Sequence, residues 1–208
     1  MTSELAVTRA SLHAVAEMLL AGPQFRSSGT IRLRVLEDGF GTVAVPDLRV
    51  EAGHLVAEAG RFRLTGTTIA ALATSADIEA GAPIGVYGEG SGASPDTEIA
   101  LDEAAAAEIL GAFTRGDAAL RRLAPSETPV LWPEHFDLGI GVGEVNYGVS
   151  PGDGWLDHPY AYVGPWEPRT GPFWNAPFGA ARPMRDLSGG DALLDFWSEG
   201  RDRAVRTS

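Results

Sequence analysis

The sequence contains no cysteine, no lysine and no long apolar run. Without cysteine, disulfides, thiolate nucleophiles and thiolate metal sites are excluded, and the chain suits a reducing compartment. Without lysine, a Walker A phosphate loop is excluded. No apolar run approaches the roughly 20 residues that span a bilayer, and the first residues lack the basic and apolar parts of a signal peptide. We therefore expect a soluble, cytoplasmic protein.

Basic residues are also few. Sixteen arginines stand against 28 acidic residues, which gives a net charge of −12. A negative surface repels phosphate backbones and anionic lipids, so we expect neither a nucleic-acid partner nor a membrane partner. The hydrophobic share of 44% is that of a globular protein. We expect a single domain over residues 1–208, and any subdivision of it would separate 8–125 from 126–208.

The apolar pattern predicts an α+β fold. The period is helical near the N-terminus, where Gly22-Pro23 is expected to end the first helix, and it changes to two from Ile31 onward. Turn residues then separate short strands, which is typical of an antiparallel meander. The expected helices are Thr8–Ala21, Asp102 (as N-cap) to Arg115, Asp117–Leu123 and Ala192–Arg201, and the expected meander strands after Ile31 are Thr42–Val45, Leu48–Glu51, His54–Glu58 and Arg61–Leu64. We predict one antiparallel sheet, made of this meander and a C-terminal hairpin, with helices packed on one side.

Two motif matches fail on physical grounds. Gly148–Gly152 fits the G-x-S-x-G nucleophile elbow, but Pro151 follows the serine and has no N–H for an oxyanion hole. Gly88–Ala93 fits a G-x-G-x-x-[GA] phosphate loop, but no helix begins there to bind a pyrophosphate. His13 and Glu17 have the i,i+4 spacing of metal ligands but lack further ligands, so we expect both on the surface.

The hairpin at 136–149 carries the most informative pattern. A two-residue turn at Gly143-Glu144, expected to be type II′, pairs three sets of apolar residues on one face: Val142 with Val145, Ile140 with Tyr147 and Leu138 with Val149, with Phe136 extending that face. The other face pairs Gly141 with Asn146, Gly139 with Gly148 and Asp137 with Ser150, and His135 lies just beyond. We call Gly139, Gly141 and Gly148 the glycine patch. Glycine within a strand often marks the close approach of a ligand or of another part of the chain.

Two interpretations of the glycine patch remain open. Either a ligand rests on it, or the protein's own aromatic side chains, such as Trp155, Trp166 or Trp174, cover it. For the first interpretation the ligand-binding candidates are Asn146, Ser150, Asp153, Tyr160, Tyr162 and Trp166. His135 and Asp137 are the catalytic candidates, as a histidine–carboxylate pair. Two ligands do not make a metal site, so we expect no metal and no cofactor.

The segment Pro151–Pro183 is expected to be a long loop. It holds half of the 14 prolines and many of the aromatic residues. Long loops in compact domains tend to be functional, and proline restricts their freedom while aromatic side chains supply contact area. The segment therefore fits a preformed pocket, a protein interface, or an aromatic cover over one end of the sheet.

Four phrases of the sequence carry a family resemblance: LWPEHFDL at 131–138, NYGVSPGD at 146–153, PYAYVGPW at 159–166 and FWNAPFGA at 173–180. With them the chain resembles a family of uncharacterised proteins from high-GC, actinobacterial-type bacteria, over most of its length. The W-P-x-H-F-D-L and S-P-G-D pieces also resemble a broader domain of unknown function. The resemblance implies no activity and assigns no catalytic residue.

Three functions are compatible with these observations. The first is a small-molecule binding protein with its site on the glycine-rich face of the hairpin. The second is a hydrolase or isomerase that uses His135 and Asp137 as an acid–base pair. The third is a structural or interaction protein whose aromatic loop forms a homodimer surface.

Overall fold

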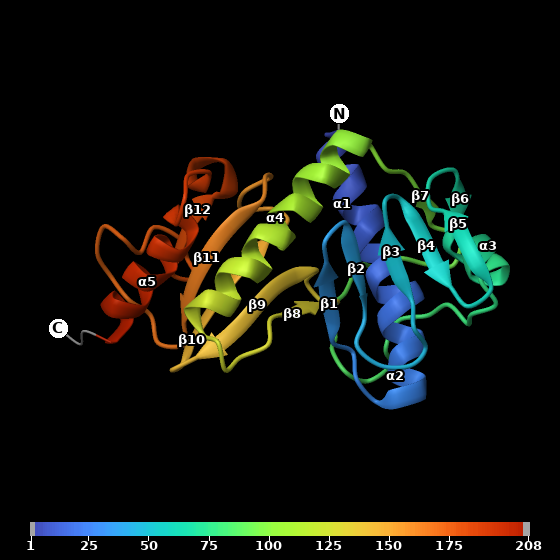
Figure 1. Cartoon of the computed structure of the whole chain (residues 1–208), viewed down its shortest axis with the longest axis horizontal. Helices are drawn as coiled ribbons and strands as arrows, with labels where there is room; N and C mark the ends of the chain where they lie inside the picture. The colour runs from blue at the N-terminus through green and yellow to red at the C-terminus, as the bar shows by residue number, and fades with distance from the viewer. Residues whose placement is uncertain (1–2, 206–208) are drawn as a thin grey trace. The chain divides into compact units, whose positions relative to one another are not determined.

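A computed structural model of the chain describes residues 3–205 (Figure 1). Within this range the chain forms two compact units. Unit 1 comprises residues 3–111 and Leu131–Phe136, and unit 2 comprises Ala112–Val130 and residues 137–205. Both units combine antiparallel strands with helices, so the predicted α+β class with an antiparallel sheet is confirmed. None of the helices in residues 3–205 has both the length and the apolar character needed to cross a bilayer.

Unit 1 contains an antiparallel meander backed by helices. Its main strands lie in the order β8-β1-β2-β3-β4-β5, and β6 pairs separately with β7. The strands are β1 (Leu33–Leu36), β2 (Gly39–Thr42), β3 (Arg49–Glu51), β4 (His54–Ala57), β5 (Gly60–Arg63), β6 (Thr67–Thr68), β7 (Glu98–Ile99) and β8 (Val130–Trp132). The helices are α1 (Glu4–Val15), the π-helix η1 (Ala16–Ala21), α2 (Gly22–Ser28), α3 (Ile69–Ser75) and the first part of α4 (Glu103–Leu123).

The first helix does not end at Gly22-Pro23, and that prediction is wrong. Helix α1 passes into η1, where the Gly22 N–H bonds to the carbonyl of Glu17, five residues earlier. Pro23 follows in α2 and has no N–H to continue this pattern, and the Met18 carbonyl, five residues earlier, accepts the Gly81 N–H at 2.9 Å. The helical path therefore continues to Ser28 and ends at Gly29, whose φ of 75° is the left-handed conformation that glycine adopts readily.

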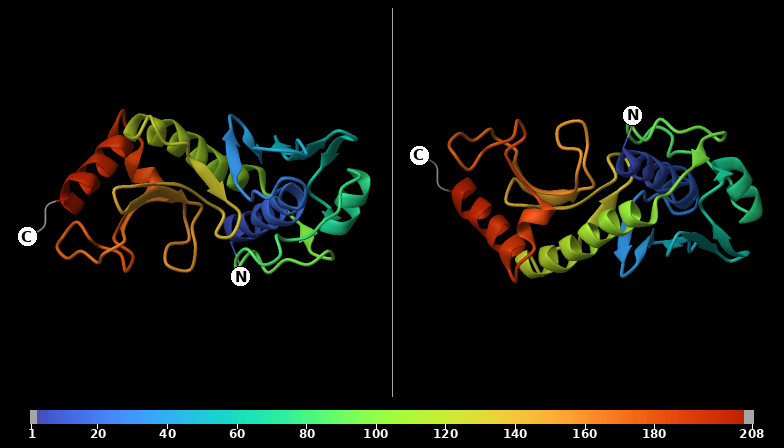
Figure 2. Two further views of the ribbon diagram at one scale, coloured as in Figure 1. Left: turned by 90° about the horizontal axis from the view of Figure 1, so that it is seen from below. Right: turned by 90° about the horizontal axis from the view of Figure 1, so that it is seen from above.

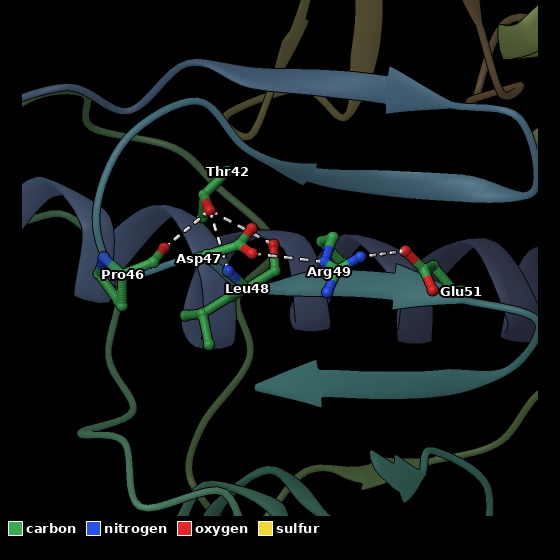
Figure 3. A network of polar contacts seen from close by, with 6 residues as sticks. All are labelled: Thr42, Pro46, Asp47, Leu48, Arg49 and Glu51. Atoms are coloured by element: carbon green, nitrogen blue, oxygen red, sulfur yellow. Dashed lines mark hydrogen bonds and ion pairs between the residues drawn. The ribbon is translucent and has the colours of Figure 1, made fainter. Parts of the chain in front are cut away.

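The side chain of Thr42 closes the connection from β2 to β3 (Figure 3). Its buried hydroxyl donates to the Pro46 carbonyl at 2.7 Å and accepts from the Leu48 N–H at 3.0 Å. Arg49, at the start of β3, bonds to Glu51 at 3.0 Å. The two Thr42 bonds satisfy backbone groups where the ladder is interrupted, so the meander keeps its register through the longer turn.

Gln24 of α2 makes a second buried anchor in unit 1. Its side chain is fully buried, and its oxygen accepts from the Val43 and Ala44 N–H groups at 2.7 and 2.8 Å. Its nitrogen donates to the carbonyls of Thr30 and Arg32 at 3.1 and 2.9 Å. One amide thus joins the chain before β1 to the turn after β2, with all of its main hydrogen-bonding positions occupied.

Unit 2 is a four-stranded antiparallel sheet in the order β12-β11-β10-β9. Its elements are β9 (Asp137–Val142), β10 (Val145–Ser150), β11 (Tyr160–Pro165), β12 (Ala180–Pro183), the 3-10 helix η2 (Met184–Leu187), α5 (Ala192–Val205) and the second part of α4. Figure 2 shows α4 and α5 on one face of this sheet and the loops at 151–159 and 166–179 on the other. The segment 151–183 is therefore not one long loop as expected, because β11 and β12 lie within it.

Helices cover the apolar face of the sheet through close glycine contacts. A Cβ on Gly116 of α4 would lie 2.6 Å from the Val149 side chain, and one on Gly200 of α5 would lie 2.6 Å from Val163. This confirms that the apolar face of the hairpin belongs to the core. Helix α4 is also continuous through Gly116-Asp117, where two helices were expected. The predicted cap is correct, since Asp102 accepts from the Ala105 N–H at 2.8 Å.

Candidate functional site

The hairpin of unit 2 has the predicted register. Five of the six expected pairs occur between β9 and β10, including Gly139 with Gly148 and Gly141 with Asn146. The sixth, Asp137 with Ser150, is not part of this ladder, and Ser150 pairs instead with Tyr160 of β11. The turn is type I′ and not II′, because Gly143 and Glu144 both have positive φ, at 59° and 62°. Strand β11 continues the same face beyond β10, and it places Tyr160, Tyr162 and Gly164 opposite Ser150, Gly148 and Asn146.

Tyr162 covers two of the three glycines in the glycine patch. A Cβ on Gly148 would lie 2.4 Å from its hydroxyl oxygen, and one on Gly139 would lie 3.0 Å from the same atom. The Tyr162 ring therefore lies across β10 and reaches β9, where its hydroxyl donates to the Asp137 carboxylate. Burial, and after it the Asp137 charge, raises the pKa of Tyr162 well above its ordinary value. Gly139 and Gly148 are buried as a result, and we call them the covered part of the patch.

Aromatic side chains from both loops pack beside Tyr162. The Phe178 ring centroid lies 6.4 Å from Tyr162, 6.1 Å from Tyr160 and 5.3 Å from Trp155. Loop 151–159 supplies Trp155 and loop 166–179 supplies Phe178, so the two loops meet above β11. These edge-on and stacked rings form an aromatic cluster on this face of the sheet, in which Trp155 and Phe178 remain partly exposed.

Asp153 and Ser150 hold the first of these loops in place. The Asp153 carboxylate accepts the N–H groups of Trp155 and Leu156 at 2.8 and 3.0 Å, and the Tyr160 hydroxyl at 2.6 Å. Ser150 is buried and accepts the Gly152 N–H at 3.2 Å. Burial and the bond to Asp153 raise the pKa of Tyr160 above its ordinary value. These three predicted site residues therefore bond to one another or to the loop backbone.

The rest of the face carries almost no side chain. Gly141, Asn146 and Gly164 are neighbours on β9, β10 and β11, and a Cβ on either glycine would meet nothing closer than 3.4 Å. Only Gly141 belongs to the glycine patch as first defined; with its two neighbours Asn146 and Gly164 it forms what we call the uncovered part of the patch. Trp166 borders it, and its side chain is 67% exposed. Its ring N–H donates to the Asn146 side-chain oxygen at 3.3 Å, and its backbone N–H donates to the Glu144 carbonyl at 2.9 Å.

His135 is not on the strand face where it was expected. Strand β9 begins at Asp137, and Phe136 has a φ of 53°, so the chain turns before the strand starts. Phe136 does not extend the apolar face of the hairpin either. It packs in unit 1, 5.7 Å from His13 and 5.5 Å from Phe40 between ring centroids. Across residues 3–205, no three His, Cys, Asp or Glu side chains gather as a metal would require.

Unit 1 contains a polar cluster that the sequence analysis missed. Glu17, expected on the surface, is only 4% exposed. Its carboxylate accepts the Ser91 N–H at 2.9 Å and the Ser91 hydroxyl. A Cβ on Gly90 would lie 2.0 Å from it, so only glycine allows the backbone to approach this closely. The glycine-rich loop at 88–93 thus approaches the protein's own carboxylate through Gly90 and Ser91.

Tyr87 and His13 complete this cluster. The Tyr87 hydroxyl is buried near Glu17, and it makes no hydrogen bond of normal geometry to a described residue. Burial raises the pKa of Tyr87 above its ordinary value. His13 Nε2 lies 2.7 Å from the Pro133 carbonyl oxygen, which can only accept, so Nε2 carries the proton. π-Helical turns such as the one that holds Glu17 are frequent at functional sites. The bonds seen here anchor loop 88–93 to the helix.

His13 makes the stability of the protein depend on pH. Burial holds the pKa of His13 below the ordinary value of 6.5, although the bond to Pro133 and the charge of Glu17 act in the opposite direction; nearby His135 lowers it further. At pH values between the pKa of His13 in the folded protein and 6.5, His13 is therefore protonated in the unfolded chain but not in the folded one. Stability falls as the pH drops through this window.

We expect His13→Gln, which keeps an N–H donor for Pro133, to remove this contribution. The free energy of unfolding in urea, measured from pH 7.5 to 5.5, should fall more steeply for the wild type than for the variant. If the free energies of unfolding of the wild type and the variant differed by the same amount at every pH in this range, His13 would not be the source of the pH dependence.

No protein-family model, no curated protein and no solved structure matches this chain. The resemblance to the high-GC bacterial family therefore stays a prediction. The case for function rests on the two places described above: the face of unit 2 around Trp166, and the closed polar cluster around Glu17.

Proposed function

We propose that unit 2 is a small-molecule binding module, and that its ligand lies with a flat ring on the uncovered part of the glycine patch. The observation that carries the proposal is the combination of a bare surface with a fixed aromatic side chain. Gly141 and Gly164 flank Asn146 on adjacent strands, and Trp166 stands beside them, two-thirds exposed. A flat ring can lie closely against the two glycines, which have no Cβ atoms, beside the Asn146 side chain.

Trp166 is preorganised for such a contact. An exposed tryptophan without polar contacts would change rotamer freely, and a ligand would have to immobilise it on binding. Here the indole N–H is already bonded to Asn146, and the backbone is bonded to Glu144. Fixing this side chain in advance removes part of the entropic cost of binding, which is about 0.5–1.5 kcal/mol for an immobilised side chain.

The acid–base alternative has less support. The Asp137 carboxylate accepts the hydroxyl of Tyr162, and His135 precedes the strand on which Asp137 lies. The proposed site therefore uses Asn146 and Trp166 from the predicted set. The other predicted residues hold the loops and cover the neighbouring glycines instead of contacting the ligand: Ser150, Asp153, Tyr160 and Tyr162.

Gly164→Val tests the proposal directly. A Cβ at Gly164 meets only ordinary contacts, at 3.6 Å or more, and valine suits a strand, so the variant should fold normally. Its side chain would project over the bare surface. We expect flat-ring fragments found by ligand-observed NMR on the wild type to bind the variant at least about tenfold more weakly, as for a steric loss of more than 1.4 kcal/mol.

Gly88→Val is the matched control, because a Cβ there meets nothing within 4 Å and the residue lies in unit 1. This variant should bind the same fragments as the wild type. The proposal fails if the screen yields no binder, or if Gly164→Val binds the fragments as tightly as the wild type. A wild type that dimerises, with a dimer lost in Gly164→Val, would instead favour the interaction-surface alternative.

A further inference from the structure

The charges around Trp166 indicate which kind of ring the uncovered part of the patch would accept. We infer that the ligand is an organic cation, with a positively charged flat ring such as a pyridinium stacked on the indole. This inference rests on the proposed function and adds the chemical class of the ligand. It is carried by two acidic residues beside Trp166, by the bonds that Arg169 makes, and by the arginine contacts of other rings in the chain.

Two acidic residues adjoin Trp166 through the backbone. Glu144 lies at the hairpin turn, and its carbonyl accepts the Trp166 N–H at 2.9 Å, which keeps the two residues side by side. Glu167 follows Trp166 directly, and its side chain is 82% exposed. A carboxylate near an aromatic face strengthens the attraction for a cation at that face, and it repels an anion. The net charge of −12 acts in the same direction at longer range.

Arg169, the nearest arginine to Trp166 in the sequence, is bonded to other parts of unit 2. Arg169 donates to the carbonyl of Ala204 in α5 at 3.2 Å, and its side chain is 28% exposed. Its other terminal nitrogen lies 3.4 Å from Glu167. Arg169 therefore offsets part of the Glu167 charge, and both of its terminal nitrogens already have partners. Its ion pair is with Glu167 and not with Glu144.

Other aromatic rings in this chain already hold a cation. Arg32 lies over Trp132 at 5.9 Å, Arg182 over Phe196 at 5.1 Å and Arg203 over Phe173 at 5.3 Å from the ring centroids. In the part of the chain that the structure describes, no arginine lies over Trp166, although this ring is more exposed than any other tryptophan or phenylalanine. Its face is thus available for a cation from outside the chain.

A pair of flat probes of equal size separates charge from shape. One is 1-methylpyridinium, which carries a permanent charge, and the other is 3-methylpyridine, which is neutral at pH 8. Dissociation constants would be measured for both by NMR titration. We expect the wild type to bind the cation about fivefold more tightly than the neutral ring, as for a partly exposed cation–π contact. This preference should vanish in Trp166→Leu.

Glu144→Gln should weaken binding of the cation about twofold and leave the neutral ring unaffected, because only the charge interaction changes. Glu58→Gln, at an exposed turn of unit 1, is the matched control and should behave as the wild type. Equal binding of the two probes, or a preference that survives Trp166→Leu, would overturn the inference. If neutral flat fragments still bind the wild type and are lost in Gly164→Val, the proposed function stands while this inference falls. If no flat ring of either charge binds, both fall.

Discussion

Replacing Gly148 with alanine is expected to destabilise unit 2 by about 3 kcal/mol, which is the upper part of the usual range for overpacking a core. A Cβ at this position would lie 2.3 Å from the Leu138 carbonyl oxygen and 2.4 Å from the Tyr162 hydroxyl. The Leu138 carbonyl belongs to the backbone of the neighbouring strand and cannot move without distorting the sheet. The Tyr162 hydroxyl could move only by breaking its hydrogen bond to the Asp137 carboxylate, which adds to the cost.

Gly164→Ala on the adjacent strand is the matched control. Its Cβ meets nothing closer than 3.6 Å, so the free energy of unfolding should change by less than about 1 kcal/mol, with alanine favoured over glycine in a strand. Denaturation in urea, followed by tryptophan fluorescence, suits this comparison because Trp155, Trp166, Trp174 and Trp197 all lie in unit 2. Equal stability of the two variants would show that Tyr162 does not lie on the covered part of the patch.

Gln24→Leu is expected to cost about 3–5 kcal/mol in unit 1. Leucine has nearly the same size as glutamine, so the effect would come from lost hydrogen bonds and not from a cavity. Four backbone groups would lose their partner, namely the N–H groups of Val43 and Ala44 and the carbonyls of Thr30 and Arg32. A buried polar group without a partner costs about 1–3 kcal/mol, and water can reach some of these groups near the exposed Val43.

Ser27→Ala, on the same helix, controls for a general effect on α2. The Ser27 hydroxyl only bonds back to the carbonyl of Pro23, one turn earlier, so its loss should change stability by less than about 0.5 kcal/mol. Urea denaturation followed by circular dichroism measures both variants. A cost below 1 kcal/mol for Gln24→Leu would mean that the amide does not hold the turn after β2 to the chain before β1.

The hairpin was predictable because its pattern is local. Apolar residues alternate on both sides of Gly143-Glu144, and a shift of one residue would turn the apolar face toward solvent. The register therefore follows from the sequence. The turn type could not be predicted from the sequence. A type I′ turn needs positive φ at both central residues, and glutamate, unlike glycine or asparagine, is not typical of that conformation.

The cover over the glycine patch was not predictable, because β11 was not recognised. Pro159 and Pro165 bracket this strand, and its two faces carry Tyr160 and Tyr162 on one side and Ala161 and Val163 on the other. Apolar character on both faces gives no period of two. Without β11, no residue could be placed opposite Gly148, and the covering ring was sought among tryptophans.

The buried position of Glu17 was hidden for a different reason. A helical period of 3.6 residues assigns faces only while the helix is regular, and η1 inserts a wider turn at this point. The glycine-rich loop at 88–93 was interpreted only as a loop, because no helix follows it to bind a phosphate. In the structure its Gly90 and Ser91 approach the Glu17 carboxylate closely.

Tyr162 closes one part of the glycine patch, and we propose that the part beside Trp166 binds a ligand. The most direct test is an assigned ¹H–¹⁵N spectrum of the protein titrated with 1-methylpyridinium. We predict chemical-shift changes at the Trp166 indole N–H and at the backbone amides of Gly141, Asn146 and Gly164, with the amides of Gly139 and Gly148 unchanged. Shifts centred on Gly139 and Gly148, or a spectrum that does not change at Trp166, would contradict the account.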